Sequence, residues 1–392
     1  MPIQSKKAND IQAYIDSHSE CKKNKQKIVI DGRVETLDSY LLPVSYLQYN
    51  HNNSRFALEI IEKETEIGRK LDMSDSEDIK VIKSLLLQDT SEAKSLKDDL
   101  KKLGEQTEVA AITHDGVVIN GNRRMATLED LNKDEPTGKW QKLWVVRLPT
   151  NISQKDLWKI EAGLQLSKDK VAEYGPVNDL LMIKEGKTAG LEPAEIAAAM
   201  YGWKEDEVNA ALERLNLIDV FLSFMKAPNN YGIIKKFRLT EHFIDIQKGL
   251  LNKLKDEGAP KKLINKKLEL AFGLIRASIV KQDVITHLEV RRLNKVLIDE
   301  DASLTFSDKV PEKSDIRDIS VDILIDNFSN AKDVLENKKD RDKPARLIER
   351  AIAALKGIDR SNQHYKTSSE VKRKILELDE IVASIKQELK IK

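Results

Sequence analysis

Asp115-Gly-Val-Val-Ile-Asn-Gly-Asn-Arg-Arg-Met-Ala-Thr127 is the stretch that decides the fold of the first part of this chain. Its Asp-Gly pair is typical of a tight turn between strands, and Val117 to Ile119 is short and apolar, as a buried strand is. Gly121 permits a bend that a Cβ would hinder. From Met125 onward the pattern favours a helix. The sequence therefore predicts a turn, a strand, a glycine corner and a helix in immediate succession.

The glycine corner carries two adjacent arginines, Arg123 and Arg124. The first amides of a helix and the positive end of its dipole favour an anion. Guanidinium groups have a fork geometry that suits phosphate oxygens. We therefore predict a phosphate-binding corner here; the alternative is a strand-to-helix turn with solvated arginines.

Composition limits the possible classes of protein. The chain has 392 residues, enough for two or three domains, and its 66 Lys/Arg against 65 Asp/Glu favour no polyanion partner as a whole. The single cysteine, Cys21, excludes a disulfide framework and a cysteine-ligated metal site within one chain. We find no apolar run of membrane-spanning length and no signal-peptide core, and therefore expect a cytoplasmic protein without membrane contact.

The pattern along the chain predicts an α+β protein. We expect a small mixed-sheet domain over residues 1–165, a helical domain over 166–302, and a linker with a helical C-terminal region over 303–392. The expected strands lie at 27–31, 110–112, 117–119 and 143–148, and residues 57–103 are expected to be helical with a break at 89–91. The linker is expected at 303–318.

Residues 195–212 have the layout of a helix-turn-helix, with Ala198, Gly202 and Val208 at the small, turn and apolar positions. Residues 191–222 hold two basic and seven acidic side chains. The second helix opens with Lys204-Glu-Asp-Glu, which would repel the phosphates that dominate DNA affinity. We favour a structural or protein-contacting role for this unit over DNA binding.

The following stretch has the opposite charge. Residues 223–282 carry 13 Lys/Arg against 5 Asp/Glu. A solvated helix face would explain these counts equally well. If the protein binds DNA, we expect the contacts here, from Lys235, Lys236, Arg238, Lys261, Lys262, Lys266 and Lys267.

The last helix has an apolar seam with alternating spacings of four and three residues, as in a coiled coil. The seam consists of Val371, Ile375, Leu378, Val382, Ile385 and Leu389. It predicts either a homodimer contact or a hairpin with residues 347–358. The six histidines show no zinc spacing, and His51 and His114 could each meet a nucleotide or simply be exposed.

Three boxes in the first half resemble the ParB/sulfiredoxin superfamily, and their order is closest to that of ParB-type partition proteins. The boxes are Tyr49-Asn-His-Asn-Asn-Ser-Arg55, Leu100-Lys-Lys-Leu-Gly-Glu-Gln106 and Gly121-Asn-Arg-Arg-Met-Ala126. The third box, which is similar to the family's Gly-Glu-Arg-Arg-x-x-Ala, is the specific one. The resemblance covers residues 40–222.

The resemblance implies a nucleoside triphosphate, CTP or ATP with Mg²⁺, and a set of residues that bind it. That set is Asn53, Arg55, Gly104, Gln106, Gly121, Asn122, Arg123, Arg124 and Gln165. The family's Glu-Asn-x-Gln-Arg metal box is represented only by Glu161-Ala-Gly-Leu-Gln165. Because Ala and Gly offer no oxygen ligand from their side chains, Glu161 is the one candidate metal ligand and catalytic residue.

Two further departures from the family's pattern limit the activities that the resemblance allows. Thr107 stands where the family has proline, and Asn122 stands where ParB proteins have glutamate and sulfiredoxins have their nucleophilic cysteine. Sulfiredoxin chemistry is therefore excluded, since an amide cannot replace a thiolate. In a free-serine-kinase branch of the superfamily, the catalytic carboxylate would come from Glu161, Asp115 or Glu129.

Three functions follow from this resemblance. The first is a nucleotide-responsive DNA-binding or scaffold protein of a plasmid, phage or genome-defence locus. The second is a Mg²⁺-dependent phosphotransferase or nuclease on the same scaffold, with Glu161 as metal ligand or base. The third is a non-catalytic interaction module whose nucleotide site has decayed.

Overall fold

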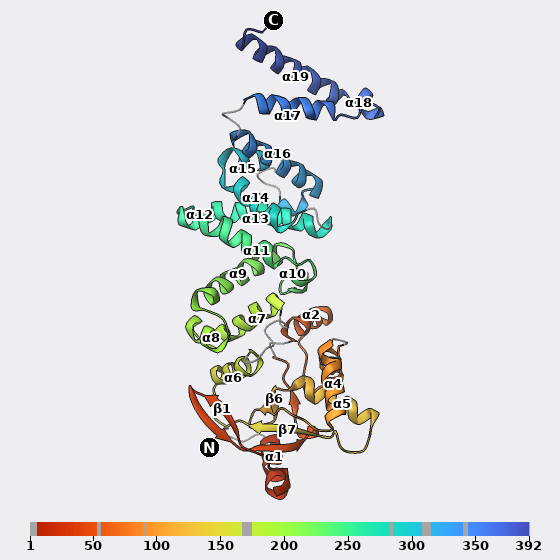
Figure 1. Ribbon diagram of the computed structural model, residues 1–392, viewed down its shortest axis with the longest axis vertical. Coiled ribbons are helices and arrows are strands. Elements are labelled where there is room, and N and C mark those ends of the chain that lie inside the picture. The colour runs from red at the N-terminus through yellow and green to blue at the C-terminus, as the bar shows by residue number, and fades with distance from the viewer. Residues whose placement is uncertain are drawn as a thin grey trace.

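The computed structural model describes residues 6–52, 56–88, 91–166, 175–281, 285–307, 315–339 and 344–391. Figure 1 shows an elongated molecule with a small sheet at one end, helices stacked along its length and the C-terminal helices at the other end. The predicted α+β class, a small mixed sheet followed by helices, is confirmed.

The main sheet has five strands in the order β3-β7-β5-β6-β4. Its strands are β3 (Ser39–Pro43), β4 (Gln48–Tyr49), β5 (Ala110–Ile112), β6 (Val117–Asn120) and β7 (Lys142–Arg147). β7 runs antiparallel to β3 and parallel to β5, whereas β6 runs antiparallel to β5 and parallel to β4. The predictions for β5, β6 and β7 are confirmed, and β3 is a strand that the sequence pattern did not reveal.

The strand expected at 27–31 is present, but it belongs to a separate hairpin. β1 (Gln26–Ile30) pairs antiparallel with β2 (Arg33–Leu37), and neither joins the main sheet. Ile28 and Ile30 are buried and share a small core with sheet residues such as Val146. The hairpin therefore covers part of one sheet face.

Several helices surround the sheet. They are α1 (Lys6–Ser17), α2 (Ala57–Ile67), α3 (Ser76–Leu86), α4 (Ser91–Leu103), α5 (Asn122–Asp134) and α6 (Gln154–Leu166), with short 3₁₀ turns at Ser19–Cys21 and Val44–Tyr46. The helical stretch expected at 57–103 is divided into three. Gly68 ends α2 with a φ of 69°, and Asp75 starts α3 by accepting a hydrogen bond from the Glu77 amide at 2.9 Å.

In the part of the chain after Arg147 that the structure describes, every regular element is helical. The first group is α7 (Gly175–Thr188), α8 (Pro193–Ala199), α9 (Glu205–Phe224), α10 (Gly232–Lys236), α11 (Thr240–Ile246) and α12 (Asn252–Asp256). A π-helical turn at Gln247–Leu251 joins α11 to α12. The second group is α13 (Lys261–Val280), α14 (His287–Ile298), α15 (Glu300–Ser307), a 3₁₀ turn at Ile316–Asp318 and α16 (Val321–Lys339).

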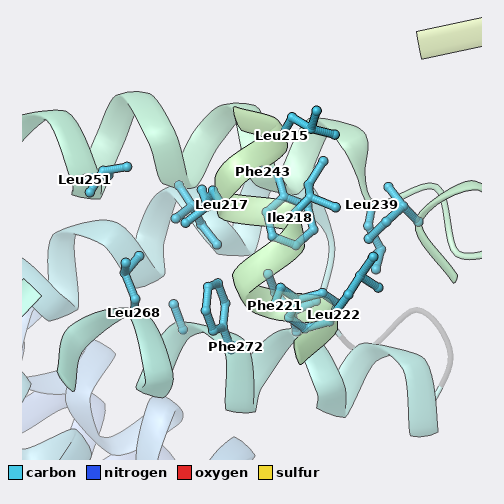
Figure 2. Packing of buried hydrophobic residues seen from close by; sticks show 14 of the residues in the cluster. Leu215, Leu217, Ile218, Phe221, Leu222, Leu239, Phe243, Leu251, Leu268 and Phe272 are labelled. Atoms are coloured by element: carbon cyan, nitrogen blue, oxygen red, sulfur yellow. The ribbon is translucent and has the colours of Figure 1, made fainter. Parts of the chain in front are cut away.

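One continuous apolar core holds the helical part together. Figure 2 shows its centre, where Phe221 of α9, Phe243 of α11 and Phe272 of α13 meet with apolar neighbours. The ring centroids of Phe221 lie 5.2 Å and 5.4 Å from those of the other two, in edge-to-face arrangements. Leu58 of α2 and Trp158 of α6 belong to the same core, which therefore reaches back to helices beside the sheet.

The expected helix-turn-helix layout is present in α8 and α9. Gly202 forms the turn with a φ of 83°, and Val208 is fully buried, but Ala198 is exposed, and Ile196 and Met200 face the core instead. The backbone amide of Lys204 donates to Glu207 Oε2 at 2.8 Å. The acidic first turn of α9 thus caps its own helix, which gives these residues a structural role.

The C-terminal region differs from the sequence-based expectation in two ways. Part of the expected linker is helical, and the last helices do not pack into a buried hairpin. Residues 303–307 continue α15, where Phe306 is fully buried. Beyond α16, the helices α17 (Pro344–Lys356), α18 (Gln363–Thr367) and α19 (Ser369–Glu388) extend from the body (Figure 1). Neither α17 nor α19 has a buried residue, so the apolar seam stays largely uncovered in one chain. None of the helices described is long and apolar enough to cross a lipid bilayer.

Candidate functional site

A large cavity of about 1210 Å³ lies between the sheet and the helices α6 and α7. Its polar lining comes from β4 and the segment after it, from the turn before β6, from α6 and the loop before it, and from α7. The polar and charged side chains there are Gln48, Tyr49, Asn50, His51, Asn52, Thr113, His114, Asp115, Thr150, Gln154, Glu161, Lys184, Glu185 and Thr188. We call it the sheet–helix cavity.

The first predicted box forms one wall of this cavity. Tyr49 is buried, and its hydroxyl donates to Glu129 Oε2 at 2.5 Å; burial, followed by the negative charge of Glu129, raises the pKa of this phenol. The side chain of Asn50 accepts from the Asn52 amide at 3.0 Å, which closes a local turn and leaves His51 at the cavity wall. Asn53 and Arg55 lie outside the residues that the structure describes.

The turn before β6 forms a second wall. Gly116 needs its φ of 91°, and a Cβ there would lie 2.8 Å from both the Tyr46 carbonyl oxygen and the Ile11 side chain. Arg147 Nε donates to the His114 carbonyl at 2.9 Å. Burial and the positive charge of Arg147 lower the pKa of His114, while Asp115 opposes them. These surroundings therefore favour the neutral form of the His114 imidazole at the cavity wall.

Glu161 lies in the middle of α6 and lines the same cavity. It is only 6% exposed, which is unusual for a carboxylate. Gln165 is on the same helix, one turn further along. Among the described residues, no three His, Cys, Asp or Glu side chains gather closely enough to hold a metal ion. A Mg²⁺ ion here would need phosphate oxygens and water to complete its shell.

The Gly121 corner lies beside this cavity, but its residues are built into the fold. Gly121 has a φ of 106°, and a Cβ on it would lie 2.6 Å from the Ala110 Cβ on β5. Asn122 is 3% exposed; its Nδ2 donates to the Val118 carbonyl at 2.7 Å, and its Oδ1 accepts from the Asn50 amide at 3.0 Å. Asn122 therefore fastens the start of α5 to the wall that carries Asn50.

The two arginines of the corner have different surroundings. The guanidinium of Arg124 is largely buried, donating to the Glu108 carbonyl at 2.7 Å and to Glu108 Oε2 at 2.6 Å. Arg123 lies with its guanidinium carbon 5.0 Å from the centre of the Phe56 ring, at the start of α2. Neither arginine lines the sheet–helix cavity.

The second predicted box is structural as well. Gln106 Nε2 donates to the Lys142 carbonyl at 2.9 Å, and its Oε1 accepts from the Trp144 amide at 3.0 Å. The side chain thus forms hydrogen bonds with the backbone of β7 at Lys142 and Trp144. From Val145 onward, β5 pairs with this edge of β7. Gly104 ends α4 with a φ of 75°, and Lys139 Nζ lies 3.0 Å from the place of a Cβ. Neither residue lines the sheet–helix cavity.

The cavity wall from α7 was not predicted. Lys184, Glu185 and Thr188 line it, and Lys184 is its one lysine or arginine among the described residues. The sequence marks this segment only as an amphipathic helix. Its position is set by tertiary packing: Gly186 sits 2.9 Å from the Trp158 ring, measured from the place of a Cβ. A contact between two helices of this kind is not predicted by any local sequence pattern.

The predicted DNA-binding residues have different surroundings in the structure. Lys261, Lys262 and Lys266 are exposed on α13, and Lys235 is paired with Glu59 of α2 at 2.9 Å. Lys236 and Arg238 are exposed and border a separate cavity beside the start of α14. Lys267 is 9% exposed, and its ammonium donates to the Leu297 carbonyl at the end of α14. Lys267 therefore holds helices together and is not part of a basic surface.

Comparisons with protein families, with curated proteins and with solved structures gave no match to this chain.

Proposed function

We propose that this chain is a nucleotide-responsive, ParB-like DNA-binding or scaffold protein, with CTP or ATP and Mg²⁺ in the sheet–helix cavity. One observation carries the proposal. The first ParB-like box, the His114 turn and Glu161 are far apart in the sequence, yet all of them line one cavity. The Asn50–Asn122 hydrogen bond joins that cavity to the start of α5, whose first turn has no side-chain cap.

The charges in the cavity favour a nucleotide that brings its own metal ion. Lys184 can neutralise one phosphate charge, whereas Asp115, Glu161 and Glu185 also lie in the lining. Carboxylates repel a bare triphosphate, but they are suitable ligands for Mg²⁺ bound to its phosphates. We therefore expect binding that depends on Mg²⁺.

Lys184 also offers a route from the nucleotide to the helices. Its ammonium lies 3.2 Å from Asp219 Oδ2 of α9 and 2.7 Å from the Tyr231 hydroxyl, just before α10. The Tyr231 hydroxyl donates in turn to Asp219. A phosphate that attracts Lys184 would weaken these contacts, and the basic residues that follow Tyr231 would respond. A ligand shifts conformation only by binding one arrangement more tightly, and Lys184 provides such a difference.

Isothermal titration with CTP, ATP and GTP, with and without Mg²⁺ and a DNA duplex, tests the proposal. We expect micromolar binding of one nucleotide, altered by DNA, and a loss of about tenfold or more in Lys184→Gln. The matched control is Lys187→Gln, on the same helix, because Lys187 pairs with Glu192 and does not line the cavity. Equal affinities in the two variants, or no binding of any nucleotide, would contradict the proposal.

A second function, a Mg²⁺-dependent phosphotransferase or nuclease, rests on the burial of Glu161 beside the cavity. It predicts turnover that requires Mg²⁺ and falls steeply in Glu161→Gln. Nucleotide binding without turnover would leave the scaffold function and remove the enzymatic one.

The scaffold function would use the C-terminal seam for a homodimer. Ile375 and Val382 are 43% and 41% exposed in the single chain, although their spacing suits a coiled coil. Light scattering during gel filtration should then give twice the monomer mass, and Ile375→Gln with Val382→Gln should give the monomer. A wild-type monomer at micromolar concentration would contradict a dimer.

A further inference from the structure

A second cavity, of about 430 Å³, lies where the end of α10, α11, the end of α13 and the start of α14 meet. It is lined by Lys236, Phe237, Arg238, His242, Ser278, Ile285, Thr286 and His287. No residue in this lining belongs to the sheet–helix cavity. We call it the α14 pocket.

The start of α14 supplies hydrogen-bond donors to this pocket. The Thr286 side chain caps the helix by accepting from the Glu289 amide. The amides of His287 and Leu288, in the same first turn, have no acceptor within the helix. Because α14 has 12 residues, the positive end of its dipole adds to these donors. This end of the helix therefore favours an anion.

His242 is the independent sign of a ligand. Its side chain lines the pocket and is 92% buried, being 8% exposed. Nε2 lies 3.0 Å from the Ile285 carbonyl, which can only accept, so Nε2 carries a hydrogen. Nδ1 is buried and has no hydrogen-bond partner among the residues that the structure describes. A buried ring nitrogen without a hydrogen bond reduces the free energy of unfolding. A ligand that forms a hydrogen bond with it would therefore stabilise the folded chain.

Two cations lie beside the pocket, and the ammonium of one of them, Lys236, is 5.4 Å from the centre of the neighbouring Phe237 ring. Lys236 and Arg238 are exposed, and neither forms an ion pair with another residue that the structure describes. Arg238 has a φ of 52°, a left-handed conformation that is rare for a residue other than glycine and is often found at functional sites. It places a long cationic side chain at the mouth of the pocket.

The acidic groups nearby are mostly neutralised. Asp245 of α11 pairs with Arg291 at 3.0 Å. Glu289 of α14 pairs with Arg292 at 2.5 Å and with Lys332 at 3.2 Å. Glu241 remains as the carboxylate next to His242 in the sequence. Among the described residues around the pocket, the balance of charge is therefore positive.

We propose that the α14 pocket is an oxyanion site that takes a phosphate group, held by the first amides of α14, by Lys236 and Arg238, and by His242 in its imidazolium form. With a proton on Nδ1, both ring nitrogens donate: one to Ile285 and the other to the anion. The site is independent of the nucleotide proposed for the sheet–helix cavity. The phosphate group belongs either to a free nucleotide or to the end of a nucleic acid strand, and the chemistry of recognition is the same.

Nuclear magnetic resonance of the histidine rings, with sulfate as the probe, tests this site in the full chain. The chain has six histidines, so the spectrum is simple, and His242→Gln identifies the His242 signal by its loss. We expect sulfate to shift that signal in a saturable way. The double variant Lys236→Gln with Arg238→Gln should weaken the affinity by about tenfold or more, because two charged donors are lost. The matched control, Lys235→Gln, removes the same kind of charge one residue away and should leave the affinity unchanged.

Competition experiments then identify the source of the phosphate. Displacement of sulfate by a nucleoside monophosphate points to a free nucleotide. Displacement only by an oligonucleotide with a terminal phosphate, and not by the same strand without it, points to a nucleic acid end. A shift that stays linear in sulfate, or one that the double variant retains in full, would overturn the proposal. These variants leave the sheet–helix cavity intact, so failure here is distinguishable from failure of nucleotide binding there.

Discussion

The N-terminal ends of α5 and α14 look alike as anion sites in principle, but the fold uses them differently. At α5, Asn122 and Arg124 are occupied by partners within the chain. At α14, as far as the described residues go, Arg238 is exposed without an ion pair, and the buried Nδ1 of His242 has no hydrogen-bond partner. A helix end with nearby cations is therefore informative about binding only when the partners of those cations are known.

The difference arises from where each helix begins. α5 starts within the layers of the sheet part, where Met125 and Ala126 are buried immediately after the corner. Polar groups in such a place must be satisfied internally. α14 starts at the surface, where its first residues, Thr286 and His287, are exposed. The following variants test this contrast, in order of decreasing expected effect.

Gly121→Ala should have the largest effect, because the glycine is required by the packing of α5. The left-handed φ costs about 1–2 kcal/mol for other residues, and the close approach to Ala110 adds about 1–3 kcal/mol of overpacking. We expect a clear fall in the midpoint of thermal unfolding. Gly202→Ala is the matched control: its φ is also positive, at 83°, but nothing lies within 4 Å of the added Cβ. Equal losses in the two variants would show that the contact with Ala110 does not matter.

Arg124→Gln and Arg238→Gln make the same chemical change at the two helix ends. Arg124→Gln removes both hydrogen bonds to Glu108 from a largely buried guanidinium, at an expected cost of about 1–3 kcal/mol. Arg238→Gln changes an exposed side chain and should stay within about 0.5 kcal/mol. Urea unfolding followed by circular dichroism measures both. If Arg124→Gln is as stable as the wild type, the corner is not held by this pair, and its arginines become candidates for ligand binding again.

The local sequence was sufficient to place the turn, the strand and the helix around Gly121, since glycine and apolar runs act over a few residues. It was not sufficient to predict the role of Arg124. Its partner Glu108 comes before β5 in the sequence, and the two side chains meet only in the folded chain. Lys267 could have been recognised as a core residue. It shares a helical face with Ile264, Leu268 and Ala271, whereas Lys266 does not.

The α14 pocket had one signal in the sequence, namely Thr286 followed three residues later by Glu289, which is typical of a helix start. That pattern marks the helix but not the site. Lys236, His242 and Thr286 come together only because α10, α11 and α14 pack side by side in the fold. The resemblance to ParB proteins concerns the α5 corner, and it predicts nothing about the α14 pocket.

Stability should also depend on pH through His242. Burial lowers the pKa of His242, and the positive charge of His287 adds to that, while Ile285, Asp245 and Glu241 oppose it. A histidine with a lowered pKa in the folded state binds its proton more readily in the unfolded state. Folding is therefore destabilised as the pH falls through about 6.5, the usual pKa of histidine.

The measurement is urea unfolding at pH 7.5 and pH 5.5 for the wild type and His242→Gln. We expect the wild type to lose more stability on acidification than the variant, and sulfate to reduce that loss by stabilising the imidazolium. His287→Gln, at the exposed rim of the same pocket, should keep most of the pH dependence of the wild type, because burial lowers the pKa of His242 more than His287 does. The same pH dependence in His242→Gln as in the wild type would show that His242 is not responsible.

Lys235→Gln should have only a small effect on stability, and it sharpens the comparison between paired and unpaired cations. Lys235 is 57% exposed and pairs with Glu59, and such a surface pair contributes about 0.2–1 kcal/mol. Burial raises the pKa of Glu62, and Lys235 opposes that increase. The variant should therefore raise the pKa of Glu62 further, which is measurable by carboxyl NMR. If Lys235→Gln instead weakened sulfate binding as much as the double variant Lys236→Gln with Arg238→Gln, the anion would be held by general surface charge and not by the α14 pocket.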